Sequence, residues 1–236
     1  ENLCRSTALF LNCQVTRNMS DYKITDKNKI KRRPDRAHYD KDTVYKIIDE
    51  ALLCHIGFVQ GGQPFVIPAL HVRQDNKLLI HGASVSRMLK YIEAGNQVSI
   101  SISIVDDIVL AKTAFNQSIN YRAVVLFGKG ELIKDEAEKL QALEYFTDGF
   151  MPGLWDDVRK PYKNELKATS IVAIEIEEAS AKIRDTPPGD DKEDRDLPVW
   201  AGLLPVKQII EAPVTADYTD DSVPVPEYVK KYISKK

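Results

Sequence analysis

The sequence has few cysteines, and none of them lies in a pattern that supports a cross-linked or zinc-bound fold. Its 236 residues include Cys4, Cys13 and Cys54, which are irregularly spaced and form no CxxC pair. This spacing excludes a disulfide framework and a structural zinc site. We therefore expect a chain that works in a reducing compartment, the cytoplasm.

Long apolar runs and a strong charge of one sign are also missing. No stretch approaches the ~20 apolar residues that a membrane-spanning helix needs, and Ala8–Leu11 is shorter than a signal-peptide core. The net charge is −2, so no overall field would draw the chain to nucleic acid or to an acidic membrane. We expect neither partner. The local basic run at residues 27–36 is interpreted as a solvated arm, with a phosphate contact as the less frequent alternative.

The length and composition favour one large domain with extensions. Hydrophobic residues make up 43% of the chain and charged residues 29%, which is ordinary for a globular protein. We expect residues 1–32 to form an N-terminal extension, poorly ordered or partly upstream of a natural start at Met19. The domain is expected at residues 33–210, followed by a tail at 211–236 that packs on its surface.

Hydrophobic spacing of three and four residues predicts several helices. One covers residues 44–52, capped by Asp42 or Thr43, and a second covers 84–94, capped by Ser84. Further helices are predicted at 135–146 and 206–211.

Period-two runs predict strands between these helices. The clearest is residues 98–104, where isoleucine and serine alternate strictly, and Asp106-Asp107 is expected to turn the chain into 108–111. Gly128, inside the strand at 121–133, predicts a bend or a close backbone approach. The other strands are predicted at 55–59, 65–72, 77–82 and 170–176, the first three as a meander beginning at the Gly61-Gly62 turn. The fold class is therefore mainly β, an antiparallel barrel with peripheral helices.

The segment His81–Leu89 combines the end of a strand, a turn of small residues and the start of a helix. Backbone amides, serine hydroxyls and the Arg87 guanidinium converge there, which suits an anion. An ordinary capped helix with a surface arginine is the alternative.

This segment resembles the phosphate-binding element of the pyridoxamine 5′-phosphate oxidase-like, FMN-binding split-barrel family, in its flavin-nucleotide-binding or nitroimidazole-resistance-like subgroup. The resemblance runs from about residue 33 to 206. Its matching segments, in order, are residues 36–40, 54–58, 66–68, 81–89, 120–122, 128–130, 152–156, 179–184 and 199–202. It implies an antiparallel Greek-key split β-barrel that binds FMN and works as a homodimer, with the flavin at the interface.

The resemblance also implies a set of cofactor-binding residues. Ser86 and Arg87 would hold the flavin phosphate, assisted by Ser84. His81 and Gly82 would line the ribityl chain and the ring edge. Main-chain groups for the isoalloxazine would come from Val66, Ile67 and Pro68.

Other implied contacts come from distant parts of the chain. Tyr121 and Arg122 would reach in from the partner subunit, and Lys182 and Trp200 complete the set. The chain departs from the pyridoxine-phosphate oxidases at three positions that are basic in them, namely Val66, His71 and Met88. The arginine and histidine that grip pyridoxal phosphate have no match in residues 203–210, so that oxidase activity is not expected.

Three functions remain open at this point. The first is an FMN-dependent oxidoreductase acting on a small substrate, with His71, His81 and Tyr121 as candidate proton donors. The second is a protein that binds, stores or senses flavin or haem without turnover, the haem being held through His71 or His81. A barrel that serves only as an interaction scaffold is a third reading. No metal site is expected from the histidines, and no G-x-S-x-G elbow supports a hydrolase.

Overall fold

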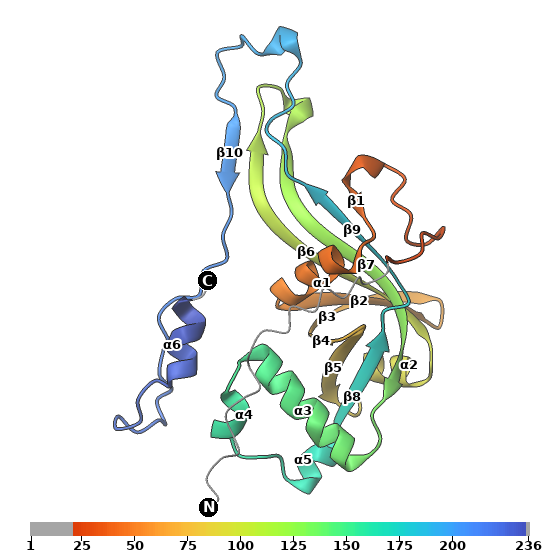
Figure 1. Ribbon diagram of the computed structural model, residues 1–236, viewed down its shortest axis with the longest axis vertical. Helices are drawn as coiled ribbons and strands as arrows, with labels where there is room; N and C mark the ends of the chain where they lie inside the picture. The colour runs from red at the N-terminus through yellow and green to blue at the C-terminus, as the bar shows by residue number, and fades with distance from the viewer. Residues whose placement is uncertain (1–20, 235–236) are drawn as a thin grey trace, which may run out of the picture.

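The computed structural model describes residues 21–234, which form one antiparallel sheet system with helices at its periphery (Figure 1). The expected upstream segment at residues 1–18 lies outside this range. The strands are β1 (Ala37–His38), β2 (Leu53–Gln60), β3 (Gln63–Leu70), β4 (Val72–Gln74), β5 (Lys77–Ala83), β6 (Gln97–Leu110), β7 (Ser118–Leu132), β8 (Thr169–Glu175), β9 (Glu178–Arg184) and β10 (Gly202–Pro205). The helices are α1 (Lys41–Glu50), α2 (Arg87–Glu93), α3 (Glu136–Phe150), α4 (Leu154–Asp157), α5 (Lys163–Ala168) and α6 (Glu227–Ser234). None of these helices is long and apolar enough to cross a bilayer.

The sheet follows the order β3-β2-β6-β7-β8-β5-β4 and does not close on itself. It divides along β7, which pairs with β9 over Tyr121–Phe127 and with β8 over Gly130–Leu132. The long strand β7 thus belongs to both halves of the sheet, as Figure 1 shows. This is the expected antiparallel split barrel.

Gly128 lies where the two partners of β7 diverge. A Cβ at this position would stand 1.9 Å from the backbone oxygen of Glu175, the last residue of β8. No side chain fits such a distance, so the close approach predicted from the sequence is confirmed. The absence of a side chain lets β8 leave the sheet and β9 begin.

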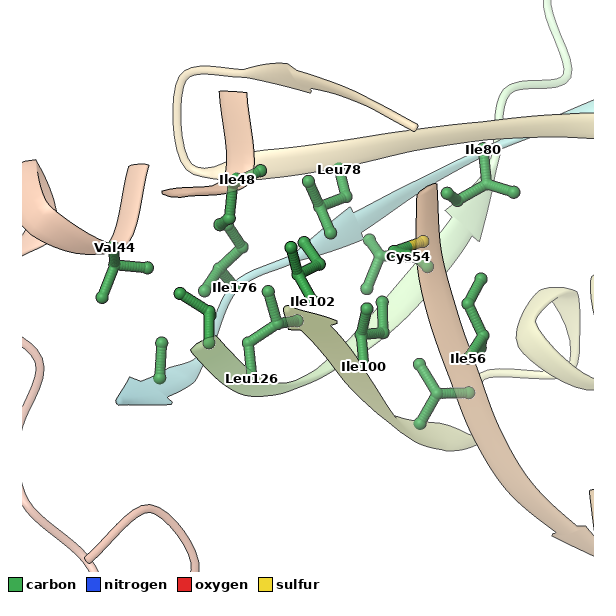
Figure 2. Packing of buried hydrophobic residues seen from close by; sticks show 14 of the residues in the cluster. Val44, Ile48, Cys54, Ile56, Leu78, Ile80, Ile100, Ile102, Leu126 and Ile176 are labelled. Carbon is green, nitrogen blue, oxygen red and sulfur yellow. The ribbon is translucent and has the colours of Figure 1, made fainter. Parts of the chain in front are cut away.

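The core fills the space between the two halves of the sheet and α1 (Figure 2). Ile100 and Ile102 of β6 are fully buried, and the intervening serines lie on the other face, as the alternation predicts. Val44 and Ile48 place the apolar side of α1 against this core. The helix therefore covers one opening of the barrel.

Both predicted helix caps were wrong by a short distance. Asp40 caps α1 by accepting a hydrogen bond from the Thr43 amide at 2.8 Å. Ser86, not Ser84, is the N-cap of α2. In both cases several capping residues stand in a row, and the cap is the one whose side chain accepts the backbone amide three residues further on.

The strand predictions also needed correction. β6 is continuous through Asp106-Asp107, where a bulge replaces the expected turn. Both hairpins of the predicted meander are present, β2 with β3 and β4 with β5, but the link between them was wrong, because β3 ends at Leu70 and the other edge of β5 pairs with β8. β9 was not predicted. Residues 206–211, expected as a helix, have no regular structure, whereas α6 forms further on.

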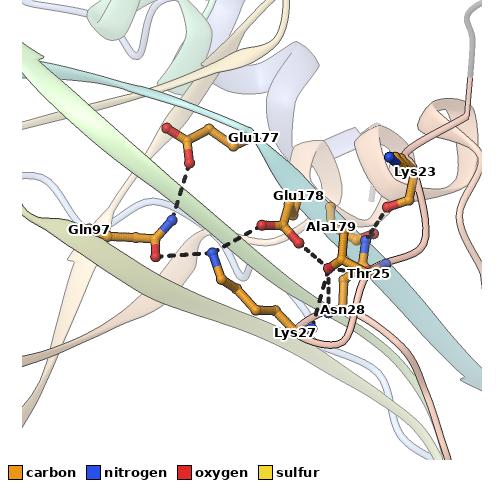
Figure 3. Close-up of polar contacts among 8 residues, drawn as sticks. All are labelled: Lys23, Thr25, Lys27, Asn28, Gln97, Glu177, Glu178 and Ala179. Atoms are coloured by element: carbon orange, nitrogen blue, oxygen red, sulfur yellow. Dashed lines mark hydrogen bonds and ion pairs between the residues drawn. The ribbon is translucent and has the colours of Figure 1, made fainter.

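The basic run is anchored at its start. Asn28 is buried and donates to the backbone oxygens of Lys23 and Ala179. Lys27 contacts Glu178 at 3.1 Å and Gln97 at 3.2 Å, as Figure 3 shows. Residues 21–30 therefore form a strap across the ends of β6 and β9, and residues 31–35 stay exposed.

Candidate functional site

The turn between β5 and α2 is held by backbone hydrogen bonds. The amide of Ser84 donates to Ala168 at 2.8 Å, and the amide of Ser86 donates to Ala83 at 2.8 Å. The hydroxyl of Ser86 accepts from the Leu89 amide at a long 3.5 Å. The turn is thus fixed while the serine hydroxyls remain only weakly engaged.

Arg87 leaves this turn with an uncompensated charge. Its guanidinium lies 4.6 Å from the centre of the Phe65 ring on β3, a cation–π contact. None of the ion pairs or hydrogen bonds found in residues 21–234 involves its side chain. The aromatic contact orients the arginine and leaves its donors available to an anion.

The same contact places the turn beside the open edge of β3. This strand pairs only with β2 and is an edge of the sheet. The two-residue Gly61-Gly62 hairpin puts Val66 opposite Gly57 in a non-hydrogen-bonded pair, so its amide and carbonyl point away from β2. Pro64 and Pro68 occupy the neighbouring outward positions and offer no donor. Val66 therefore carries the one backbone amide that points outward from the β3 edge between the two prolines. Ile67 is its neighbour in the strand.

His81 and Gly82 point to opposite faces of β5, as neighbours in a strand do. Gly82 faces Leu89 of α2, with 3.3 Å left for a Cβ. The His81 ring instead meets Phe146 of α3 edge-on, with centroids 4.3 Å apart. Desolvation there lowers the pKa of His81.

His71 lines a separate cavity of about 510 Å³ beneath α1, α3 and α6. Its Nε2 lies 2.9 Å from the backbone oxygen of Ile48, while its buried Nδ1 has no hydrogen-bond partner in the described part of the chain. Burial lowers the pKa of the ring. A neutral imidazole with one nitrogen held by a carbonyl and the other unpaired is the state in which histidine binds metals. Arg73, Tyr145 and Tyr232 line the same cavity.

Tyr121, Arg122 and Lys182 lie away from the β5–α2 turn. Tyr121 stands opposite Arg184, and Lys182 stands opposite Ala123, on the outer face of β7 and β9. Arg122 points to the other face, where its guanidinium binds the carboxylates of Glu50 and Asp106. Both contacts raise the pKa of Arg122.

Trp200 and Arg87 lie near opposite ends of β6 within one chain. β10 pairs with the last residues of β6, and α2 precedes the first. β6 has 14 residues, and with a rise of about 3.3 Å per residue its ends lie on the order of 40 Å apart. Trp200 is 62% exposed, and its ring folds back onto Gly202. In a single chain, Tyr121, Lys182 and Trp200 do not join the turn and the β3 edge.

No three histidine, cysteine or acidic side chains come together as a metal site within residues 21–234. Trp155, which lies in the matching segment at residues 152–156, is buried.

Comparisons with known proteins agree with this architecture. The family model described as pyridoxamine 5′-phosphate oxidase matches residues 40–183, more than half of the chain. The chain belongs to this family. No curated protein matches it.

Two solved structures resemble this family member over most of its length. The flavocytochrome Anf3 from Azotobacter vinelandii is 37% identical, with a TM-score of 0.83, covering 88% of this chain and 96% of that one. An FAD- and haem-binding protein from Mycobacterium smegmatis is 29% identical, with a TM-score of 0.80, covering 83% and 96%. A 5-nitroimidazole antibiotic resistance protein from Bacteroides thetaiotaomicron, so described provisionally, is 20% identical with a TM-score of 0.53 and covers 62% and 86%, which supports the fold alone.

The family match leaves some residues outside it. Arg36 precedes the matched range, and Arg184 and Trp200 follow it. The cavity at His71 was not anticipated as a cavity, because its walls come from α1, β4, α3 and α6. One residue of the sequence marks its wall, the glycine at position 149 inside helix α3. A Cβ on Gly149 would lie 2.5 Å from the Val72 side chain, so α3 can approach β4 only without a side chain there.

Proposed function

We propose that this chain is a flavin-dependent oxidoreductase that holds the flavin phosphate at Arg87, Ser86 and Ser84. The carrying observation is the position of Arg87, oriented by Phe65 and without a counter-charge, beside the outward backbone groups of Val66. A phosphate at the turn would neutralise the charge of Arg87, and a flat ring along β3 would contact the backbone groups of Val66. When bound, the flavin supplies the electron transfer, and the protein orients it and excludes water.

The family and the two relatives that match most of this chain support a flavin. One relative is a flavocytochrome and the other is described as binding FAD and haem. The resemblance found in the sequence favours FMN, and the relative's description favours FAD. The visible spectrum of the purified protein, followed by chromatography of the released flavin, identifies which nucleotide is bound.

The phosphate contact is tested by Arg87→Gln. Loss of a charge-assisted contact costs about 1.5–3 kcal/mol, so flavin affinity should fall roughly tenfold or more. Arg159→Gln is the matched control, because Arg159 is an exposed arginine whose partner is Glu165. Flavin fluorescence titrations of both variants give the answer. Equal affinities would show that the phosphate does not bind at Arg87.

A haem is the second ligand that the structure favours. The cavity at His71 falls within the ~300–1,000 Å³ of cofactor sites, and the unpaired Nδ1 provides a ligand atom for iron. Of the two relatives reported above, one is named a flavocytochrome and the other is described as binding haem. A Soret band after haem addition, lost in His71→Ala, tests this assignment. Arg73 and Tyr145 would lie beside the haem in this cavity.

Turnover separates an oxidoreductase from a flavin carrier. We propose that the flavin of the purified protein is reduced by NADH or NADPH and passes its electrons to a small oxidised substrate. His81 is the candidate closest to the turn in sequence, and because its lowered pKa favours the neutral ring at physiological pH, its ring would act as a hydrogen-bonding group or proton acceptor there. Stopped-flow reduction tests the proposal, and failure with both donors would favour a binding role.

We further propose a homodimer in which the partner's Tyr121, Lys182 and Trp200 complete the flavin site. Exposed apolar side chains support it, since they follow the projecting ends of β6 and β7 and the strand β10. These residues are Ile108, Phe115, Ile119, Val199, Trp200, Leu203 and Leu204. A monomer would leave this apolar surface in water.

A further inference from the structure

Arg184 is a buried cation without a buried anion. It is 7% exposed, yet no carboxylate of residues 21–234 forms an ion pair with it. Its Nη1 donates to the amide oxygen of Asn120 and to the backbone oxygen of Thr186 at 3.1 Å. Both acceptors are neutral, so the full charge remains.

Asn120 fixes this arrangement. It is fully buried, its amide nitrogen donates to Asp107 at 2.8 Å, and its oxygen also accepts from the Thr186 amide at 3.2 Å. The amide is therefore held with its oxygen toward Arg184. Because Nη1 takes both acceptors, Nε and Nη2 have none among the described residues and can receive an anion.

Other cations gather at the same place. β1 pairs with β9 at Ala37 and Lys182, so Arg36 precedes the pair directly beside the end of β9. The pKa of Arg184 is lowered chiefly by desolvation and then by the repulsion of Arg36, with Arg33 adding to it. Arg36 forms none of the ion pairs of residues 21–234. Like charges that are partly removed from water repel one another strongly, so this arrangement is unfavourable unless an anion binds between them.

The strand register adds two further donors on one face. Lys182 and Arg184 are two residues apart on β9, and Tyr121 stands directly opposite Arg184 on β7. Among the described residues, the one acceptor of the Lys182 ammonium is the Arg32 backbone oxygen, at 3.0 Å. We infer that Arg184, Arg36 and Lys182, with the Tyr121 hydroxyl, form a binding site for a phosphoryl anion, specifically the diphosphate of a nucleotide. The planar guanidinium fork suits phosphate oxygens, and three cations match the charge of a diphosphate.

The site is tested by calorimetric titration of FMN-saturated protein with pyrophosphate in 150 mM NaCl, roughly the physiological ionic strength at which weak surface attraction is screened. Saturable binding is expected, weakened tenfold or more in Arg184→Gln and in Arg36→Gln. Arg36→Gln removes a partly exposed side chain without hydrogen bonds of its own, so it preserves the fold if Arg184→Gln does not. Arg159→Gln, which changes the net charge equally, should bind like the wild type. Absence of saturable binding, or unchanged affinity in Arg36→Gln, would overturn the proposal.

Two further arms identify the source of the diphosphate. Loss of pyrophosphate binding in FAD-saturated protein would show that the flavin's own diphosphate fills the site, whereas retained binding and an equal response to ADP would show a separate nucleotide. The same titration on protein as purified probes Arg184 and Arg36, which lie outside the proposed flavin site, whereas Lys182 and Tyr121 are shared with it. Pyrophosphate binding without FMN binding would therefore contradict the proposed function and leave this site supported.

Discussion

At the scale of single residues, Gly128 makes the division of the barrel possible at the point where β7 changes its partner from β9 to β8. Its missing side chain accommodates the backbone oxygen of Glu175, which is part of the main chain and cannot rotate away. Gly128→Ala should therefore lower the free energy of unfolding by about 2–4 kcal/mol, in the range of severe packing clashes. Gly189→Ala is the control, because a Cβ there meets no atom within 4 Å. Urea unfolding of both variants is the measurement, and equal midpoints would contradict a branch point at Gly128.

A second single residue, His71, makes the free energy of unfolding depend on pH. Burial lowers its pKa in the folded protein below the usual value of 6.5. The unfolded chain therefore binds a proton first as the pH falls, and stability present above pH 6.5 is lost on acidification toward the lowered pKa. The wild type should lose more stability between pH 7 and pH 5.5 than His71→Gln, whose amide can still donate to Ile48. Urea midpoints at the two pH values measure this difference, and parallel losses would indicate that His71 is not buried in its neutral form.

At the scale of elements, the start of α1 decides how the barrel opening is covered. Asp40 accepts the Thr43 amide, whereas Asp42 lies within the first turn and caps nothing. Asp40→Ala should cost about 1 kcal/mol of stability, and Asp42→Ala about 0.3 kcal/mol through the helix dipole. Thermal unfolding of both variants distinguishes them. A larger loss in Asp42→Ala would return the cap to the position expected from the sequence.

The edge strand β3 shows how one element serves two needs. Its outward positions alternate Pro64, Val66 and Pro68, and the prolines remove the donors that another strand would use. The edge is thereby protected against aggregation while Val66 retains its backbone groups. The free amide and carbonyl of Val66 are the backbone groups that the proposed flavin ring would contact.

At the scale of the whole molecule, the arm formed by β10 and the ends of β6 and β7 is the surface that we propose for the dimer. Sedimentation should give twice the 26.7 kDa of the chain. Leu204→Lys places a charge on the exposed apolar pair of Leu204 and Ile108 and should shift the protein toward monomer. Val223→Lys, at an exposed site outside the arm, is the control. A wild-type monomer would contradict both the dimer and a flavin site shared between subunits.

The sequence by itself determined the elements whose periodicity is strong. The isoleucine and serine alternation of residues 98–104 is enough to fix a strand and its buried face, because side chains in a strand alternate strictly. Gly128 signalled a close approach, and the strand, turn and helix around Arg87 formed in the predicted order, while the anion site there stays a prediction. Each of these depends on neighbours in the chain, so local patterns suffice.

Only the tertiary structure decided the pairings over long distances. β9 is short and follows β8 after two residues, so its separate pairing with β7 and β1 leaves no local pattern. Three features of the sites depend on residues that are far apart in the chain. They are the contact of Arg87 with Phe65, the cavity at His71 and the neutral surroundings of Arg184. The register between distant strands and the packing of α1, α3 and α6 set these contacts. A single sequence read along its length carries no record of that register.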